Sequence, residues 1–183
     1  EISRLAPPGA AHQGLALKAP PLEPFDIADV ARPAKGVIVV LDQITDPQNV
    51  GAIFRSAAAF GARAIVLQDR HAPVLAGALA KAAAGAIERV PHVRATNLSR
   101  ALEALSDHGW RAVGLDADAA ASLAETLDER PVALVLGSEG EGLRRLVAEH
   151  CDALARIPMA GGFESLNVAA AAAIALYETV RQR

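Results

Sequence analysis

The stretch GGFESLNVAAAAAIALYE, residues 161–178, joins a polar, glycine-containing loop to a helix made largely of alanine. Gly161 and Gly162 can adopt positive φ, so the chain can turn sharply there. Ser165 suits the N-cap position, and we expect a helix over residues 165–180. Alanine gives high helix propensity and a narrow helix, which can lie close to other backbone. Apolar residues at helical spacing predict one packing face on this helix: Leu166, Ala169, Ala170, Ala173, Tyr177 and Val180.

Upstream of this stretch, short apolar runs alternate with helical patterns from residue 36 onward. Alternation of this kind indicates crossover units, and so an α/β fold with a mostly parallel sheet and helices on both faces. The strand candidates are continuously apolar, which is typical of strands buried on both sides. We expect strands at residues 37–41, 64–68, 88–93, 111–115, 132–136 and 153–157. We expect the remaining helices at residues 47–60, 74–84, 98–108, 123–127 and 143–149.

Length and composition limit the classes of protein that this chain can represent. Its 183 residues are 52% hydrophobic, enough for one folded domain and a flanking segment. Prolines concentrate in residues 1–35 and predict an extended linker or arm, so the domain is expected over residues 36–183. No apolar run reaches the roughly 18 residues that would predict a membrane span. The absence of a secretory signal and the single cysteine, Cys151, favour the cytoplasm, and the scattered histidines predict no metal site.

The segment LDQITDPQNVGAIFR, residues 41–55, follows the first expected strand. Asp46 suits the N-cap position, and Pro47 suits the first helical turn, where its missing N–H costs no hydrogen bond. Asn49 lies in that first turn, near the carboxyl end of a strand, where ligands bind in open α/β sheets. Arg55 lies off the apolar stripe of the same helix. Asn49 and Arg55 are therefore candidate functional residues, with ordinary turn and surface roles as the alternative.

The segment VALVLGSEGEGLRRL, residues 132–146, runs from a buried strand into a glycine loop and then into a helix. Its glycine order, G-x-x-G-x-G, differs from the dinucleotide fingerprint G-x-G-x-x-G, and no Gly-Lys-Ser/Thr follows to make a P-loop. Glu139 and Glu141 would also repel a diphosphate. A ligand that is neutral or cationic at this loop, such as a sulfonium cofactor, suits it better. A simple exposed turn is the alternative.

Three spaced motifs together resemble a known family. They are N-x-G-x-x-x-R after Asp-Pro, G-x-E-G-x-G after a strand, and I-P-M-x(5)-S-L-N-V near the C-terminus. This combination resembles the SpoU/TrmH group of the SPOUT RNA methyltransferases over most of residues 36–183. Within that group it is most similar to the bacterial 23S rRNA guanosine-2'-O-methyltransferases, whose interdomain segment also resembles His12-Gln13-Gly14. The resemblance implies S-adenosylmethionine-dependent 2'-O-methylation of a ribose, expected on a guanosine of 23S rRNA.

The resemblance also implies a C-terminal trefoil knot, in which the last helix passes through the loop before it. It implies a homodimer through the knotted region, in which each active site borrows groups from the partner subunit. The implied cofactor contacts, carried over by motif position, are Gly137, Ile157 and Leu166, flanked by Leu136, Met159 and Ser165. The implied polar active-site set is Asn49, Arg55, Glu139, Ser165 and Asn167.

The resemblance implies that Arg55 activates the 2'-hydroxyl. A guanidinium has a pKa above about 12 and is a poor general base. We therefore expect Arg55 to bind the adjacent phosphate and to stabilise the developing oxyanion. Asn49 and Asn167 would orient the groups around it, and Glu139 would hold Arg55 or Asn167 in place.

Two departures from the family pattern are visible in the sequence. Ala169 stands where the family often has serine, which leaves one hydrogen bond at the helix start open. Family members usually carry an N-terminal RNA-binding domain of the L30e type, which we expect to be absent from this chain. Candidate RNA contacts, with ordinary surface charge as the alternative, are Arg63, Arg70, Lys81, Arg89 and Arg94.

Other functions stay open from the sequence alone. The RNA substrate could be tRNA instead of rRNA, and the chain could be a catalytically silent RNA-binding module. The joint presence of Asn49, Arg55 and Glu139 argues against a silent module. A Rossmann nucleotide-dependent oxidoreductase is disfavoured by the glycine order.

Overall fold

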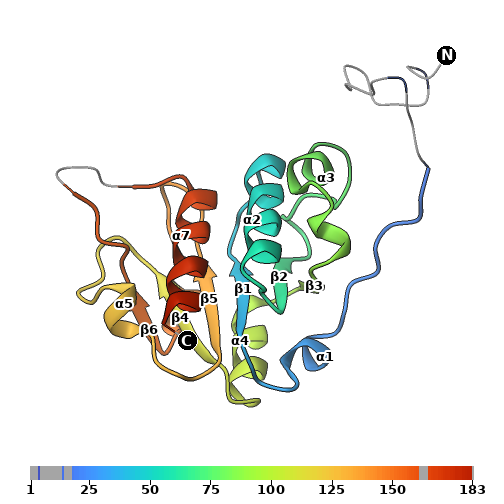
Figure 1. Ribbon diagram of the computed structural model, residues 1–183. Helices are drawn as coiled ribbons and strands as arrows, with labels where there is room; N and C mark the ends of the chain where they lie inside the picture. Colours follow the sequence, from blue (N-terminus) through green and yellow to red (C-terminus); the bar gives the residue numbers. More distant parts are fainter. Residues whose placement is uncertain (1–3, 5–13, 15–17, 161–164, 183) are drawn as a thin grey trace.

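The computed structural model describes residues 4, 14, 18–160 and 165–182 of the chain. In this part of the chain, six strands form one sheet in the order β3-β2-β1-β5-β4-β6, and every neighbouring pair is parallel (Figure 1). The predicted α/β class and parallel sheet are therefore confirmed. The strands are β1 Val37–Leu41, β2 Ala64–Gln68, β3 His92–Ala95, β4 Arg111–Leu115, β5 Val132–Leu136 and β6 Ala153–Ala155.

Helices cover both faces of the sheet, as the buried strand pattern predicts. Val37, Val39 and Leu41 of β1 belong to one hydrophobic cluster, which α2, α3 and α7 complete. Ile38 and Val40 point to the opposite face, which α1, α4 and α6 cover (Figure 1). The helices are α1 Ile27–Ala31, α2 Pro47–Ala59, α3 Gly77–Ala83, α4 Leu98–Ser106, α5 Leu123–Thr126, α6 Arg145–Glu149 and α7 Val168–Arg181, with a 3-10 helix, η2, at Ala86–Glu88.

The third strand begins later than the sequence predicts, at His92 instead of residue 88. The chain turns at Ala84 and Gly85, both in the left-handed conformation, and then forms η2. Ile87 and Val90 are buried in the cluster on the α2 face, not paired in the sheet. A short apolar run is compatible with a buried strand or with a buried helical turn, and periodicity alone does not distinguish a strand from a helical turn.

The last helix begins at Val168 and not at Ser165. Its N-cap is Asn167, whose Oδ1 accepts the N–H groups of Ala169 and Ala170 at 3.0 and 3.3 Å. The predicted packing face is also wrong: the buried residues are Val168, Ala172, Ala175, Leu176 and Thr179, while Tyr177 and Val180 are exposed. A helix that is apolar on most sides gives no clear stripe, so its orientation depends on its neighbours.

The last strand ends at Ala155, two residues earlier than predicted. Arg156 leaves the sheet because its N–H donates to the carbonyl of Ala121 at 3.0 Å, and its own carbonyl accepts from Leu123 at 2.8 Å. Arg156 thus pairs with Ser122, in the segment before α5, in place of a strand of the sheet.

The proline-rich segment is extended over residues 18–26 and then forms the short helix α1, which the proline density did not predict. The N–H of Phe25 donates to the carbonyl of His92 at 2.8 Å, so the segment lies along the edge strand β3. The indole N–H of the buried Trp110 donates to the carbonyl of Ala31 at 2.9 Å. Arg63 donates to the carbonyls of Val30 and Arg32. These bonds fasten α1 to the sheet.

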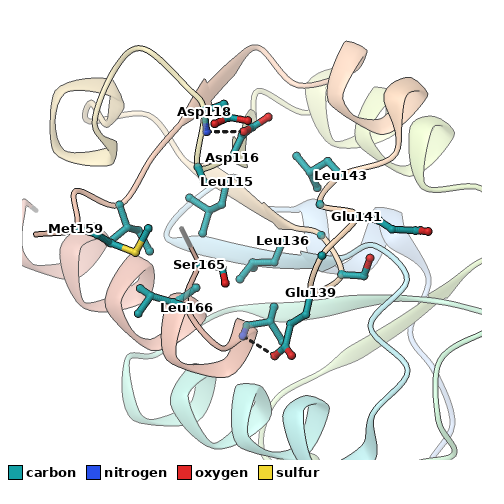
Figure 2. A pocket seen from close by; sticks show the side chains of 18 residues that line it. Leu115, Asp116, Asp118, Leu136, Glu139, Glu141, Leu143, Met159, Ser165 and Leu166 are labelled. Atoms are coloured by element: carbon teal, nitrogen blue, oxygen red, sulfur yellow. Dashed lines mark hydrogen bonds between the residues drawn. The ribbon is translucent and has the colours of Figure 1, made fainter. Parts of the chain in front are cut away.

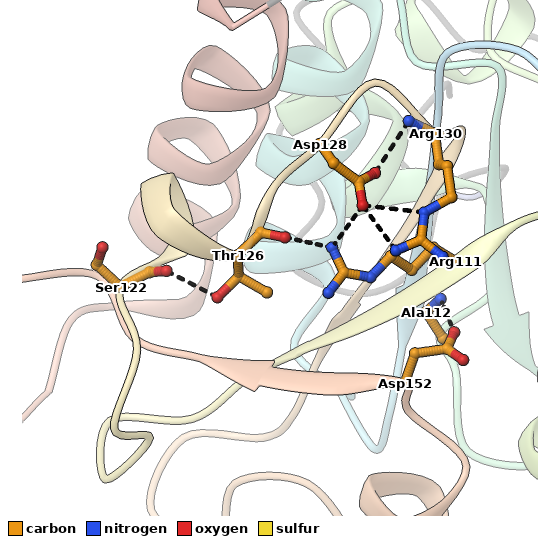
Figure 3. A network of polar contacts seen from close by, with 7 residues as sticks. All are labelled: Arg111, Ala112, Ser122, Thr126, Asp128, Arg130 and Asp152. Carbon is orange, nitrogen blue, oxygen red and sulfur yellow. Dashed lines mark hydrogen bonds and ion pairs between the residues drawn. The ribbon is translucent and has the colours of Figure 1, made fainter.

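A cluster of charged residues lies at the amino edge of the sheet, where β4 and β5 begin (Figure 3). Asp128 accepts from Arg111 at 3.2 Å and from Nε and Nη2 of Arg130 at 2.9 and 2.6 Å. Its hydrogen bonds with Arg130 are the main reason why the pKa of Asp128 lies below its usual value. The cluster fixes the loop before β5 at the edge opposite the site described below.

None of the described helices combines the length and the apolar character that crossing a bilayer requires. The expected knot depends on how the chain runs through residues 161–164, which lie outside the described residues. The threading of α7 therefore stays a prediction.

Candidate active site at the carboxyl edge of the sheet

A cavity of about 810 Å³ lies where β4, β5 and β6 end (Figure 2). Loops that follow these three strands line it, together with the first turn of α7. Parallel strands end at the same edge, so residues that are far apart in the chain meet there. The volume falls within the range of about 300–1,000 Å³ that is typical of small-molecule sites.

One wall of the cavity is the glycine hairpin, which we define as residues 137–142. Ser138 and Gly142 exchange two backbone hydrogen bonds, at 3.1 and 3.0 Å, and Gly140 and Gly142 have φ values of 90° and 68°. A Cβ on Gly137 would lie 2.1 Å from the carbonyl carbon of Gly142. The two limbs of the hairpin therefore pack at a distance that only glycine permits at this position.

The polar cluster at the site consists of Asn49, Glu139 and Asn167, one residue from each motif. Oε1 of Glu139 accepts from Nδ2 of Asn49 at 3.3 Å and from Nδ2 of Asn167 at 2.8 Å. Asn167 also donates to Oδ1 of Asn49 at 2.9 Å. The same Glu139 oxygen accepts the N–H of Val168 at 3.0 Å, where a carboxylate also suits the positive end of the helix dipole.

The helix that carries Asn49 starts as predicted. Asp46 is its N-cap and accepts the N–H groups of Gln48 and Asn49 at 3.2 Å each, with Pro47 in the first turn. This cap fixes the first turn of α2 beside the hairpin and so places Asn49 within reach of Glu139.

Arg55 lies apart from the polar cluster. It is exposed on α2, and among the described residues no hydrogen bond or ion pair joins it to Asn49, Glu139 or Asn167. Of the two partners expected for Glu139, the structure brings Asn167 into contact and leaves Arg55 out. Ser165 is exposed and lines the cavity instead of capping α7.

The residues expected at a cofactor all line the cavity. They are Leu136, Gly137, Ile157, Met159, Ser165 and Leu166. The lining also carries Asp116, Asp118, Glu139 and Glu141, and no Lys, Arg or His stands among its described residues. The field inside the cavity therefore favours a cation over an anion.

The loop after β4 was missed in the sequence. Leu115, Asp116 and Asp118 line the cavity, and Oδ1 of Asp116 accepts the N–H of Asp118 at 2.8 Å (Figure 2). The available signal was positional: residues 111–115 were expected to be a strand of the same parallel sheet, so the residues after them had to reach the same edge. Across the described ranges, no group of three His, Cys, Asp or Glu side chains could hold a metal ion.

Two of the five candidate RNA contacts bind backbone within the protein. Arg94 donates to the carbonyls of Gln68, Ala72 and Pro73 at 3.4, 3.3 and 2.7 Å, and burial lowers its pKa. Arg63 binds the α1 segment, as described above. The other three are exposed: Arg70, Lys81 and Arg89.

A model of the SpoU rRNA Methylase family matches residues 36–177. An uncharacterized tRNA/rRNA methyltransferase of Mycobacterium sp. (strain KMS) is 46% identical over 179 residues. That match covers 95% of this chain and 57% of the relative, so the chain spans little more than half of the relative's length.

Two solved structures are similar to this chain in both sequence and fold. The AdoMet-bound rRNA methyltransferase from Sinorhizobium meliloti is 32% identical, with a TM-score of 0.80, over 87% of this chain and 61% of that protein. A structure that concerns the 2-OH methylation of C/U34 on tRNA is 33% identical, with a TM-score of 0.71, over 80% of this chain and 95% of that protein.

Proposed function

The chain belongs to the SpoU rRNA methylase family, and we propose that it transfers a methyl group from S-adenosylmethionine to a ribose 2'-hydroxyl of RNA, with a guanosine of 23S rRNA as the expected acceptor. The main support for the proposal is that residues from all three sequence motifs are hydrogen-bonded to one another. Glu139 joins Asn49 and Asn167 at the rim of an acidic cavity, at the edge of the sheet where ligands bind.

The cavity suits S-adenosylmethionine in charge and in apolar surface. The sulfonium and the α-ammonium group are cationic, and the lining supplies four carboxylates. Leu115, Leu136, Ile157 and Leu166 offer apolar surface for an adenine ring. Gly137 leaves its backbone accessible. The AdoMet-bound relative from Sinorhizobium meliloti supports this choice of cofactor.

When bound, S-adenosylmethionine supplies a methyl group on a positively charged sulfur, which leaves as a neutral thioether. The residues of this chain would position the ribose and stabilise the negative charge that develops on its 2'-oxygen as the hydroxyl proton passes to water. Asn167 already uses both its amide nitrogen and its oxygen within the protein, so we assign it a positioning role. Asn49 also uses its oxygen, which accepts from Asn167, but its amide nitrogen donates only at the longer distance of 3.3 Å, so we assign Asn49 the contact to the RNA.

Arg55 would bind the phosphate beside the reacting ribose and stabilise the oxyanion. Because Arg55 does not meet the polar cluster of its own chain, we propose that it completes the site of a second copy. The exposed side of α7 supports this arrangement, since Ile174, Tyr177 and Val180 are 42%, 54% and 47% exposed and would be covered in a homodimer. Sedimentation equilibrium should show a dimer, and Tyr177→Glu should yield inactive monomers.

A methyl-transfer assay tests the function. The chain is incubated with radiolabelled S-adenosylmethionine and with 23S rRNA or bulk tRNA, and mass spectrometry of the digested RNA identifies the product. We expect 2'-O-methylguanosine from 23S rRNA. No methyl incorporation into either RNA, despite cofactor binding, would instead indicate a silent RNA-binding module. A titration with NADH serves as the control for nucleotide-dependent oxidoreductase function.

A tRNA ribose is the second candidate acceptor. The relative described for methylation of C/U34 on tRNA is matched over 95% of its length, so its whole chain corresponds to the domain described here. Product on tRNA alone would favour this alternative.

A further inference from the structure

Asp42 holds the far limb of the glycine hairpin. It directly follows β1, and its side chain is fully buried. Its Oδ1 accepts Nε of Arg144 at 2.8 Å, and its Oδ2 accepts the backbone N–H of Arg144 at 2.9 Å. Arg144 stands two residues after the hairpin ends and 102 residues after Asp42. A single carboxylate therefore binds the hairpin's exit with both of its oxygens.

Asp42 also binds the near limb. Its backbone N–H donates to the carbonyl of Leu136 at 2.8 Å, immediately before Gly137. One residue is thus bonded both to the entry and to the exit of the hairpin. The limbs between these two points pack against each other at Gly137 and Gly142, so their separation depends on how the two ends are held.

The residue next to Asp42 is fixed in an unusual conformation. Gln43 has φ of 56°, in the left-handed region that non-glycine residues seldom adopt, and its N–H donates to Oε1 of Gln68 at 3.0 Å. Residues in such conformations persist where the surrounding structure holds them, and they concentrate at functional sites. The bond to Gln68 anchors the turn after β1, and with it the backbone that carries Asp42.

We propose that Asp42 is a positioning residue for the cofactor: it sets the spacing of the glycine hairpin so that the hairpin's backbone fits the methyl donor. The inference rests on the proposed function, because it takes the cavity as the S-adenosylmethionine site. Asp42 does not line the cavity, and it acts through Arg144 and Leu136. The hairpin's other attachment, from Glu139 to α7, orients its tip, whereas Asp42 holds its base.

The chemistry of the contact explains why a carboxylate is needed. Both Arg144 groups are donors, and an ionised carboxylate only accepts. In Asp42→Asn the amide nitrogen would face one of these donors, so one bond would be replaced by repulsion between two N–H groups. Arg144→Ala removes only the Nε bond and keeps the backbone N–H.

The test measures S-adenosylmethionine binding by isothermal titration calorimetry, well below the melting temperature of every variant. Two structural controls are used. Asp128→Asn breaks a carboxylate–arginine cluster at the opposite edge of the sheet (Figure 3), and Leu102→Ala weakens the core through buried α4. We expect Asp42→Asn to raise the Kd by about tenfold or more, the range expected for losing a hydrogen bond to a charged group, and Arg144→Ala to raise it less. Both controls should keep the wild-type Kd.

Hydrogen exchange provides the second readout, which needs no cofactor. In Asp42→Asn, amides of residues 137–144 should exchange faster, while those of residues 128–130 should not change. Wild-type Kd and unchanged exchange in Asp42→Asn would overturn the inference. If Asp42→Asn fails to fold, a wild-type Kd in Arg144→Ala would overturn it. A wild-type chain that binds no S-adenosylmethionine would instead overturn the proposed function.

Discussion

The carboxylate of Glu139 and the backbone N–H of Val168 lie 3.0 Å apart, although 29 residues separate them in the chain. This bond joins the tip of the glycine hairpin to the first turn of α7. Because the same oxygen also accepts from Asn49 and Asn167, one atom connects all three sequence motifs. The glycine hairpin, which forms one wall of the cavity, and the polar cluster are therefore joined directly to each other.

Removing this carboxylate should loosen the whole site. Glu139→Ala removes the acceptor of the Val168 N–H and of the Asn49 amide nitrogen, and leaves the Asn167 amide nitrogen with Oδ1 of Asn49 alone. Losing a carboxylate that accepts a hydrogen bond at a helix N-terminus costs about 1–2 kcal/mol, which corresponds to a fall in Tm of roughly 2–8 °C for a chain of this size. Thermal denaturation followed by circular dichroism measures the change. Glu141 is on the same hairpin, and among the described residues no hydrogen bond joins its side chain to the rest of the site, so Glu141→Ala should stay within about 2 °C of the wild type.

Gly137→Ala should be more damaging than any other single change in the hairpin. Its Cβ would lie 2.1 Å from the carbonyl carbon of Gly142 and 2.4 Å from the nitrogen of Leu143, and backbone cannot move aside as a side chain can. We expect a loss of stability of about 3 kcal/mol or more and no cofactor binding. Gly140→Ala is the control: its Cβ would have open space, so only the strain of its positive φ, about 1–2 kcal/mol, should appear. Equal stability of the two variants in urea denaturation would contradict the packing argument.

Arg55→Ala should abolish methyl transfer and spare cofactor affinity. Arg55 is exposed and outside the cavity lining, so its loss should remove the proposed contact to RNA and leave the cavity of its own chain unchanged. Arg55→Lys keeps the charge but loses the two-pronged geometry that suits phosphate, and should recover only part of the rate. Single-turnover assays and calorimetry on the same preparations separate the two effects. Normal turnover in Arg55→Ala would refute the assignment.

His150 should titrate above its usual pKa of 6.5. Its ring hydrogen-bonds the carbonyl of Leu146 at 2.7 Å and the carboxylate of Glu103 at 3.0 Å, and both favour the protonated form. Since the pKa is raised on folding, the stabilisation is fully present below pH 6.5 and is lost as the pH rises through the folded-state pKa. NMR titration should show this shift and its reduction in Glu103→Gln. His92, whose pKa is lowered mainly by burial, should titrate below 6.5 in both proteins.

Cys151 should be unreactive in the folded protein. Burial raises the pKa of its thiol to about 12, so almost no thiolate is present near pH 8. We expect no reaction with a colorimetric disulfide reagent in buffer and rapid reaction in denaturant. Rapid labelling of the native chain would show that the segment around Cys151 opens readily.

Signals that are local in the sequence predicted the structure well. The cap at Asp46, with Pro47 behind it, and the continuous apolar strands are complete within a few residues, and the structure agrees with them. The start of α7 was different, because both Ser165 and Asn167 can cap a helix. Asn167 is the N-cap in the structure, where it also bonds to Glu139 and Asn49. Both partners are far away in the chain, so the choice between the two caps could not be made locally.

The parts of the site that the sequence did not reveal depend on tertiary contacts. Asp42 reads as an ordinary residue after a strand, and only its contact with Arg144 distinguishes it. The apolar pattern predicts a strand over residues 88–93, but only the part from His92 onward pairs in the sheet, and Ile87 and Val90 are buried beside the 3-10 helix. A short apolar run alone does not tell a strand from a helical turn. The short helix α1 is held by Trp110 and Arg63, neither of which is near it in the sequence.

The pairing of β1 with β5 has a kinetic consequence. The centre of the sheet joins the first strand of the chain to the fifth, so this pairing must bring together residues that are far apart in the sequence. Contacts between such distant residues slow refolding, and β1 presents an unpaired, wholly apolar edge until β5 arrives. Aggregation during refolding should therefore begin at β1, and dilute protein should recover in higher yield than concentrated protein.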